Sequence, residues 1–240
     1  MAKIKELSVF FPAYNEQDNL KATVEKARVV LQKVAQDYEI IIVDDGSQDK
    51  TGAVADALAR SRDNIRVIHH PRNRGYGAAL KSGLYAAKYP WIVFTDADGQ
   101  FDFAEITRFL ETQQQTAADL VIGYYLKRQV PFYRILGSKI WQLTVWALFG
   151  LNVKDIDCGF KLLRRGVMQK IPKLEAERGP FISSELLIKA KNAGFKIAEL
   201  GVHHYPRRKG FATGASFGVV IAGFKDLWRL RGKLKNEQKN

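Results

Sequence analysis

The sequence predicts an α/β fold, in which a mixed but mostly parallel sheet is covered by helices on both faces and is followed by an amphipathic C-terminal helix. Residues 7–125 alternate between apolar runs and segments with helical periodicity, which is typical of parallel sheets buried on both faces. Polar residues follow four of the apolar runs in succession. The carboxyl ends of the strands are the edge at which such sheets bind ligands.

Each element of the first half follows from a short pattern. We expect strands at 7–12, 38–46, 64–70, 91–98 and 118–125, and helices at 16–36, 51–61, 77–88 and 101–115. The strands are nearly continuous apolar runs, whereas the helices carry apolar residues at helical spacing. Asp102 stands where it can cap the last of these helices.

The pattern is less regular after residue 126. Residues 127–150 are basic at first, then aromatic and amphipathic. We expect a strand and a short helix in 155–172, a helix at 182–194, a strand at 195–206, a basic loop at 207–217 and a helix at about 217–235. Gly194 stands where it can end the helix expected at 182–194.

Length and composition bound the class of protein. A chain of 240 residues, 46% of them apolar, fits one compact domain with at most a small appendage. Its single cysteine, Cys158, excludes an internal disulfide. The N-terminus does not have the pattern of a signal peptide. The most apolar window, 135–153, contains Lys139 and Gln142, so we expect no membrane-spanning helix.

The formal net charge is +13, and much of the excess lies after residue 126. Such an excess favours anionic partners, namely nucleic acid, anionic lipid or a phosphorylated substrate. A basic, solubilising surface is the alternative interpretation. The acids at the strand ends would repel a nucleic acid backbone, so we expect no nucleic acid partner. A non-enzymatic basic binding module therefore ranks last.

The acid pair in "WIVFTDADGQF" is the first candidate site. If the strand continued through Asp96 and Asp98, their carboxylates would face one pocket, because alternate residues of a strand point the same way. Two like charges so close repel each other. Mg²⁺ or Mn²⁺ would resolve the conflict, since both prefer carboxylate oxygens and are completed by phosphates. A turn with an Asx-type hydrogen bond is the alternative.

Two further motifs lie at the same edge. In "VDDGSQDKT", Asp44 or Asp45 can accept hydrogen bonds from ring N–H groups or ribose hydroxyls, unless they only decorate a turn. In "NRGYGAALKSG", Gly75 allows close approach of the backbone. This is not a dinucleotide fingerprint, because Leu80 stands where the third glycine is required.

Together, "FPAYNE", "IIVDDGSQDKT", "NRGYGAALKSG", "FTDADGQ" and "DIDCGFKLLRR" closely resemble family 2 glycosyltransferases of GT-A (Rossmann-like) fold, and within them the dolichyl-phosphate mannose synthase group. The resemblance covers about residues 6–215. It implies an inverting transfer from a nucleotide-diphosphate sugar, GDP-mannose or a UDP-hexose, to a polyprenyl (dolichyl or undecaprenyl) phosphate. It also implies that Mg²⁺ or Mn²⁺ assists.

The resemblance assigns donor-side residues by position. Those expected to bind the nucleotide-sugar are Pro12, Tyr14, Glu16, Asp44, Asp45, Gly75, Lys81 and Asp96. Asp98 and Gln100 would ligate the metal, and Asp96 would stand on the ribose and diphosphate side of it. Asp98, bridged by the metal to the β-phosphate, would stabilise the leaving nucleoside diphosphate.

Acceptor-side residues follow in the same way. The resemblance places Arg134 and Ser138 at the acceptor phosphate, with Lys127 or Arg128 as a loose further match, and Arg207 in the loop that closes over the donor. Arginine suits phosphate because its planar fork binds two oxygens. Any one of these residues is alternatively a solvated surface charge.

A hydroxyl acceptor is the alternative for the same family. It would need a general base, and Asp157 or Glu185 are the candidates. Glu185 is alternatively a first-turn helix residue favoured by the helix dipole. His203 and His204 lie at a strand end with their roles open.

The resemblance implies a catalytic domain over residues 1–215. Its nucleotide-sugar half reaches about 125, its acceptor half is 126–215, and 216–240 form an amphipathic helix and tail. Aromatic and basic residues on separate faces of 134–149 and 217–235 fit helices lying on anionic lipid. We therefore expect a cytoplasmic protein bound to the cytoplasmic face of a membrane, directly or through a membrane-protein partner. Ordinary packing of these helices on the sheet is the alternative.

Overall fold

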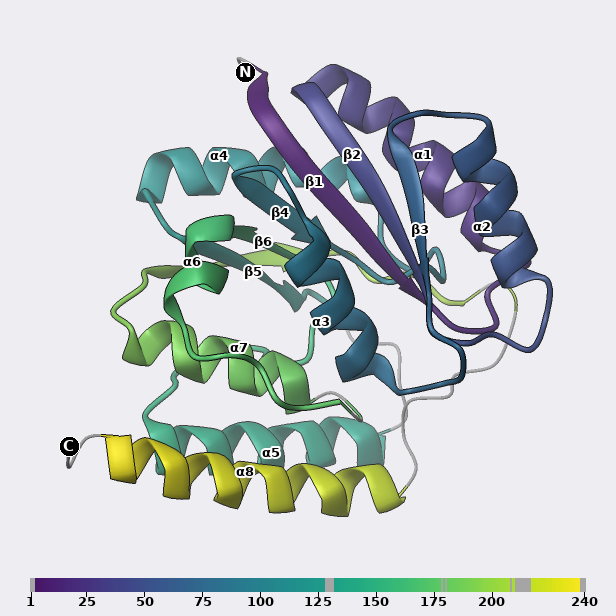
Figure 1. The fold of residues 1–240 in the computed structure, drawn as a ribbon. Coiled ribbons are helices and arrows are strands. Elements are labelled where there is room, and N and C mark those ends of the chain that lie inside the picture. Colours follow the sequence, from purple (N-terminus) through teal and green to yellow (C-terminus); the bar gives the residue numbers. More distant parts are fainter. Residues whose placement is uncertain are drawn as a thin grey trace.

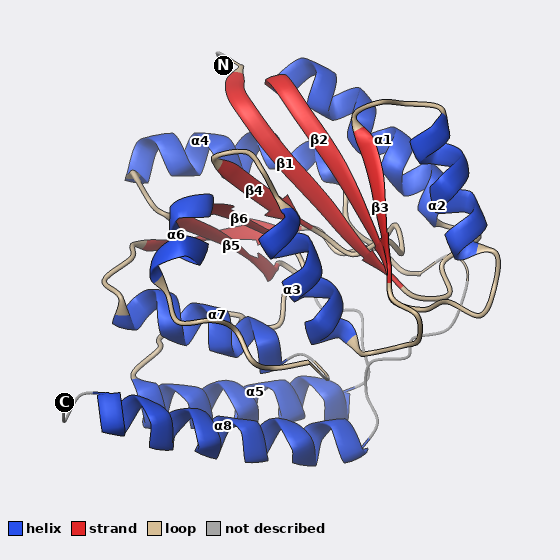
Figure 2. Cartoon of the chain, viewed as in Figure 1, coloured by secondary structure: helices blue, strands red, loops and turns tan. Residues whose placement is uncertain are grey.

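A seven-stranded sheet forms the centre of the protein (Figures 1 and 2). The computed structural model describes residues 3–127, 132–177, 179, 181–207, 209 and 217–237. The strands are β1 (Ile4–Ala13), β2 (Ala35–Asp44), β3 (Ile65–His69), β4 (Trp91–Phe94), β5 (Leu120–Tyr125), β6 (Lys161–Arg164) and β7 (Ile197–Val202). The expected α/β fold is confirmed.

The strand order is β3-β2-β1-β4-β6-β5-β7. All neighbouring strands are parallel except β6, which pairs antiparallel with both β4 and β5. The sheet is therefore mixed and mostly parallel. The carboxyl ends of β1, β2 and β4 meet at one edge, where Ala13 pairs with Asp44 and Phe10 with Phe94.

Helices cover both faces of this sheet. They are α1 (Leu20–Val34), α2 (Thr51–Arg60), α3 (Tyr76–Ala86), α4 (Ile106–Thr116), α5 (Phe132–Phe149), α6 (Arg165–Lys170), α7 (Phe181–Asn192) and α8 (Phe217–Glu237), with a 3₁₀ turn η1 (Phe103–Glu105). Helices α1, α2 and α4 bury their apolar faces on one side of the sheet. Helices α3, α6 and α7 cover the other side.

Helices α5 and α8 lie side by side beyond α7, as an outer layer on that side of the sheet (Figure 1). Trp141 of α5 joins the layers, because its ring packs edge-on against Phe181 of α7 and Phe224 of α8. Its indole N–H also donates to Ser184 Oγ at 3.0 Å. Within the described residues, no helix combines the length and apolarity that a bilayer span requires.

Several predicted boundaries differ by a few residues from those of the structure, and two of these errors lie at the strand ends that carry the candidate residues. The helix expected from residue 16 begins at Leu20, because Glu16 O accepts from the N–H groups of Asn19 and Leu20 in a preceding turn. The strand expected at 91–98 ends at Phe94. Residues 95–100 form a turn, so strand alternation does not orient Asp96 and Asp98. The cap at Asp102 is confirmed, since its carboxylate accepts from Ala104 N at 3.0 Å.

Candidate functional site

The turn after β4 carries the acid pair. Asp98 Oδ1 accepts from Gln100 N at 2.9 Å, and Gly99 between them has φ +73°. The Asx-type turn therefore exists, but it uses only one carboxylate oxygen of Asp98. The other oxygen, Oδ2, faces the guanidinium of Arg207 at 2.9 Å.

Asp96 lies in a tight enclosure. Its Oδ1 accepts from the hydroxyl of Tyr76 at 3.0 Å. The main chain of Gly159 backs onto the carboxylate so closely that a Cβ there would lie 2.4 Å from Oδ2. Burial, followed by the charge of Asp98, raises the pKa of Asp96 to about 7. The two acids therefore share one electrostatic site although no strand aligns them.

Arg207 joins two separate strand ends. Its guanidinium contacts Glu16 Oε1, after β1, at 2.7 Å and Asp98 Oδ2, after β4, at 2.9 Å. Burial alone would lower the pKa of Arg207, but these carboxylates outweigh it and raise that pKa. The arginine therefore stays charged, and it neutralises much of the acid cluster.

The segment that carries Arg207 is fastened across the acid turn. Tyr205 N donates to Gln100 O, and the side-chain amide of Gln100 donates to Tyr205 O, both at 2.8 Å. Farther along, Lys209 O accepts from the side chain of Asn19 at 3.2 Å. Gln100, an expected metal ligand, is thus bound through its amide nitrogen to the main chain beside Arg207.

The aspartates after β2 have structural partners. Asp44 accepts from Ser47 N at 3.0 Å and contacts the ring of His69 at 3.0 Å. Asp45 accepts from the main-chain N–H groups of Arg74 and Gly75, at 3.0 and 2.8 Å. Its Oδ1 also forms a hydrogen bond of 2.6 Å with Nδ1 of the buried His70 ring.

Gly46 completes this donor-side loop. Its φ is +68°, and a Cβ there would lie 2.2 Å from Arg72 C, so two loops approach with no room for a side chain. Asp45 and Gly46 therefore fix the shape of the 72–75 loop. The expectation that Asp44 or Asp45 also contacts a nucleoside stays a prediction.

The remaining donor-side residues are spread more widely. Pro12 is buried within β1, while Tyr14 is half-buried just beyond it. Glu16 is buried, and its N–H donates to Thr51 Oγ1 at 2.7 Å. Lys81 does not join the acid cluster. Its ammonium donates to Glu175 O and Glu177 Oε1, at 3.2 and 3.1 Å.

A second cluster lies where α5 meets segment 155–161. Ser138 Oγ donates to Asp157 Oδ2 at 2.7 Å, while Asp157 Oδ1 is buried and has no hydrogen-bond partner within the described part of the chain. Both residues line a pocket of about 140 Å³, which Lys139 and Lys154 also line. Gly159 of the same segment backs onto Asp96, so one stretch of chain touches both clusters. Arg134 lies in α5, but its side chain and all of Arg128 are outside the described residues.

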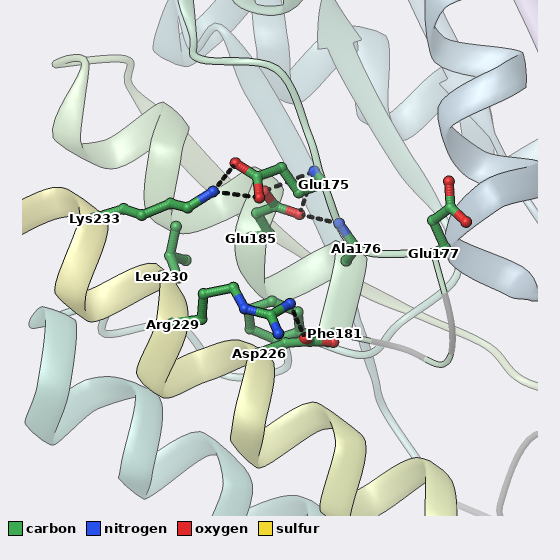
Figure 3. A pocket seen from close by; sticks show the side chains of 9 residues that line it. All are labelled: Glu175, Ala176, Glu177, Phe181, Glu185, Asp226, Arg229, Leu230 and Lys233. Atoms are coloured by element: carbon green, nitrogen blue, oxygen red, sulfur yellow. Dashed lines mark hydrogen bonds and ion pairs between the residues drawn. The ribbon is translucent and has the colours of Figure 1, made fainter.

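The carboxylate of Glu185 binds the main chain of a neighbouring loop (Figure 3). Its carboxylate accepts from the N–H groups of Glu175 and Ala176 at 2.9–3.0 Å and pairs with Lys189 at 2.6 Å. The pair is almost fully buried beside a cavity of about 370 Å³ between α7, α8 and residues 175–177. These contacts leave Glu185 no access to the acid pair, so it does not fit the role of a general base.

The histidines at the end of β7 face different ways. His203 pairs with Glu105 on the exposed side of η1. His204 packs edge-on against Phe101 and Tyr125, with ring centroids 5.1 and 4.8 Å away. His203 therefore binds η1, whereas His204 packs on Phe101, which follows the acid turn.

Three residues around Asp96 were not among the sequence candidates: Tyr76, Gly159 and Lys161. Lys161 is fully buried in β6, donates to Cys158 O and lies 5.6 Å from the Phe94 ring centroid. Burial lowers the pKa of its ammonium. A lysine inside the apolar run "GFKLL" was the available signal, because a buried cation in a strand requires nearby acids.

The acid turn fits a hard divalent cation. The part of the chain that the structure describes contains no group of three His, Cys, Asp or Glu residues that could hold a metal. Mg²⁺ sites often use only one or two protein carboxylates and complete their shell with substrate phosphates and water. One member of the pair, Asp98, already binds a cation, the guanidinium of Arg207. The donor set of Asp96, Asp98 and Gln100 is consistent with such an ion.

Comparisons with known proteins agree with this geometry. The model of a family described as glycosyl transferase family 2 matches residues 8–172. Polyprenol monophosphomannose synthase from Mycolicibacterium smegmatis is 32% identical over 94% of this chain and 88% of its own. Dolichyl-phosphate beta-glucosyltransferase from Homo sapiens is 32% identical over 83% of this chain and 67% of its own.

A solved structure supports the fold alone. Glucosyl-3-phosphoglycerate synthase from Mycobacterium tuberculosis, in complex with Mn²⁺, UDP and phosphoglyceric acid, superimposes with a TM-score of 0.64. It is 22% identical and covers 85% of this chain and 72% of its own.

Proposed function

This chain belongs to glycosyltransferase family 2 and is a glycosyltransferase, and from that premise we propose that it moves a hexose from a nucleotide-diphosphate sugar to a polyprenyl phosphate, with inversion and with Mg²⁺ or Mn²⁺. The observation that carries the donor half is the Asp96–Asp98 turn, closed by Arg207 at the carboxyl edge of the sheet. GDP-mannose and UDP-hexoses are the candidate donors.

Each residue of the acid turn has a distinct task in this proposal. Tyr76 and Gly159 hold Asp96, and the backbone of Gln100 holds Asp98. A divalent ion bound there would supply Lewis-acid stabilisation of the leaving diphosphate. Arg207 adds a positive charge on the same side, where negative charge develops as the sugar departs.

The acceptor half rests on the pocket at Ser138 and on the relatives. A phosphate oxygen is already anionic, so it needs positive neighbours more than it needs a base. The pocket offers the hydroxyl of Ser138 with Lys139 and Lys154 at its lining. Two relatives are named for transfer to polyprenol or dolichyl phosphate. The contribution of Arg134 is proposed from the sequence.

A hydroxyl acceptor is the second candidate, and Asp157 favours it. Its Oδ1 is buried at the pocket without a partner among the described residues, which suits a carboxylate that takes a proton from a bound hydroxyl. Asp157→Asn separates the two functions. It abolishes transfer to a hydroxyl, whereas transfer to a phosphate that is already ionised continues at a reduced rate.

The outer helix layer supports the proposal that the protein associates with a membrane. Leu136, Ile140, Leu143 and Trp146 of α5 and Trp228 of α8 are all about half exposed or more. Cationic side chains such as Lys139 stand among them. Aromatic and aliphatic groups beside cations suit an anionic lipid surface. We propose that this layer rests on the cytoplasmic face of the membrane that holds the acceptor.

The layer is tested with the double variant Leu143→Ser, Trp146→Ser. Leu143 is 62% exposed, and burying a half-exposed leucine contributes about 1 kcal/mol, with more from tryptophan. We expect sedimentation with anionic vesicles to weaken about tenfold or more. Val29→Ser is the control, because Val29 is 45% exposed on α1, across the sheet. Equal binding of both variants would refute the assignment.

The activity is tested by incubating the protein with Mn²⁺ and a panel of nucleotide sugars, with and without a short polyprenyl phosphate. Nucleoside diphosphate release that requires the lipid phosphate supports the proposal and identifies the sugar. Release that ignores the lipid favours the hydroxyl acceptor. Asp98→Asn is expected to reduce transfer at least about 100-fold. Activity within a few fold of the wild type would contradict the metal assignment.

A further inference from the structure

Arg207 has an unusual set of contacts for a residue near a metal site. Its guanidinium spans two carboxylates, Glu16 and Asp98, that belong to different strand ends. The side chain is only 19% exposed, and its Nε–H is buried without a hydrogen-bond partner among the residues that the structure describes. The arginine is thus held by two acids, which use two of its five N–H donors.

Each carboxylate oxygen of Asp98 already has a partner while this arrangement lasts. Oδ1 accepts from Gln100 N, and Oδ2 accepts from Arg207. A divalent cation on Oδ2 would stand within a few ångströms of the guanidinium. Two cations on one carboxylate oxygen repel each other strongly in a partly buried site. Metal binding at Asp98 and the Arg207–Asp98 ion pair therefore oppose each other.

We propose that Arg207 is an internal counter-ion, which keeps the acid pair neutralised until metal and donor arrive and which then binds the diphosphate. The inference rests on the proposed metal role of Asp98. The contacts of the guanidinium support the second half, because the pairs with Glu16 and Asp98 leave further N–H groups that can donate to an oxyanion. The planar fork of arginine matches two oxygens of a phosphate as well as it matches two carboxylates.

Removal of the Arg207 guanidinium is expected to raise the affinity for metal and to lower the affinity for nucleoside diphosphate. Without nucleotide, metal binds only to the fraction of molecules in which Asp98 is free, so its apparent affinity is reduced by that fraction. Removing the guanidinium removes this competition. With nucleoside diphosphate present, the same removal deletes a diphosphate contact. A purely structural role would weaken both.

The test measures Mn²⁺ binding by electron paramagnetic resonance of free Mn²⁺, without any nucleotide. We expect Arg207→Gln to bind Mn²⁺ about tenfold more tightly than the wild type, which corresponds to about 1.4 kcal/mol. Arg207→Lys keeps the charge but cannot span both acids as well, so its affinity for Mn²⁺ should lie between those of the wild type and Arg207→Gln. Affinity for UDP or GDP in saturating Mn²⁺ should fall about tenfold in Arg207→Gln.

Arg28→Gln is the matched control. Arg28 is 20% exposed and pairs with Glu25 at 2.8 Å on α1, so its removal deletes a similar pair elsewhere and should change neither affinity. Unchanged, weaker or undetectable Mn²⁺ binding by Arg207→Gln would overturn the proposal. Asp98→Asn tests the proposed metal role of Asp98 separately. If this variant binds Mn²⁺ as tightly as the wild type, Asp98 is not the metal ligand.

Discussion

Gly159→Ala would disturb the acid turn while all of its charged residues are kept. The added Cβ would lie 2.4 Å from Asp96 Oδ2 and 2.9 Å from Cγ. The backbone of Gly159 lies outside the left-handed region, so alanine itself is not strained there. The conflict is therefore confined to the carboxylate, which must move.

The size of the effect follows from the geometry. Ordinary contact with a Cβ begins near 3.4 Å, so Oδ2 must retreat by about 1 Å, and a shift of that size in a reacting site can cost about 100-fold. The retreat also breaks the hydrogen bond from Tyr76. A hydrogen bond to a charged group contributes about 1.5–3 kcal/mol, or roughly 10–100-fold in affinity.

Calorimetric titration of Mn²⁺ with a nucleoside diphosphate measures the loss, and we expect affinity to fall by about 10–100-fold. Gly166→Ala is the control, because the nearest atom to a Cβ at Gly166 is 3.8 Å away. Thermal unfolding confirms that both variants fold. Wild-type affinity in a folded Gly159→Ala protein would mean that Asp96 is not part of the site.

Three further changes test the supports around the site. Glu185→Gln or Lys189→Met leaves one buried charge unpaired and should lower the free energy of unfolding in urea by about 3–5 kcal/mol, with a smaller loss in the double variant; single losses under about 1 kcal/mol would contradict this. The aspartate partners of His69 outweigh its burial and raise its pKa, so it contributes stability below the unfolded pKa of about 6.5 that is lost as pH rises through the folded pKa. His69→Gln should therefore destabilise more at about pH 6 than at about pH 8, and an equal loss at both would contradict the ion pair. Gly46→Ala forces a Cβ to within 2.2 Å of Arg72 C and should cost more than about 3 kcal/mol; a stable variant would show that the two loops separate freely.

The sequence was most informative where structure depends on local patterns. The strands and helices of the first half are nearly all present, because their apolar periodicity coincides with burial on the two faces of the sheet. The edge at which polar residues gather was also predictable, since parallel strands end together. The contact of Arg207 with Asp98 brings residues from both halves of the chain to that edge.

Several features of the site depend on tertiary contacts, which local sequence patterns do not predict. The early end of β4 depends on Tyr76 and Gly159, which hold Asp96 in a turn rather than a strand. Lys81 turned toward Glu177 because segment 174–177 packs beside α3, a neighbour that no local pattern indicates. Glu185 was a candidate base because no local pattern shows that its carboxylate binds the N–H of Glu175, ten residues upstream.

The place of β6 in the sheet makes the order of synthesis matter. β4 and β5 are complete by Tyr125, but the strand that joins them is Lys161–Arg164. At about 5–20 residues per second on a ribosome, the chain spends seconds with β4 open on one edge and β5 open on both. Open edges offer N–H and C=O groups to any passing chain. We expect chaperones that shield strand edges to act on this protein between those two points of its translation.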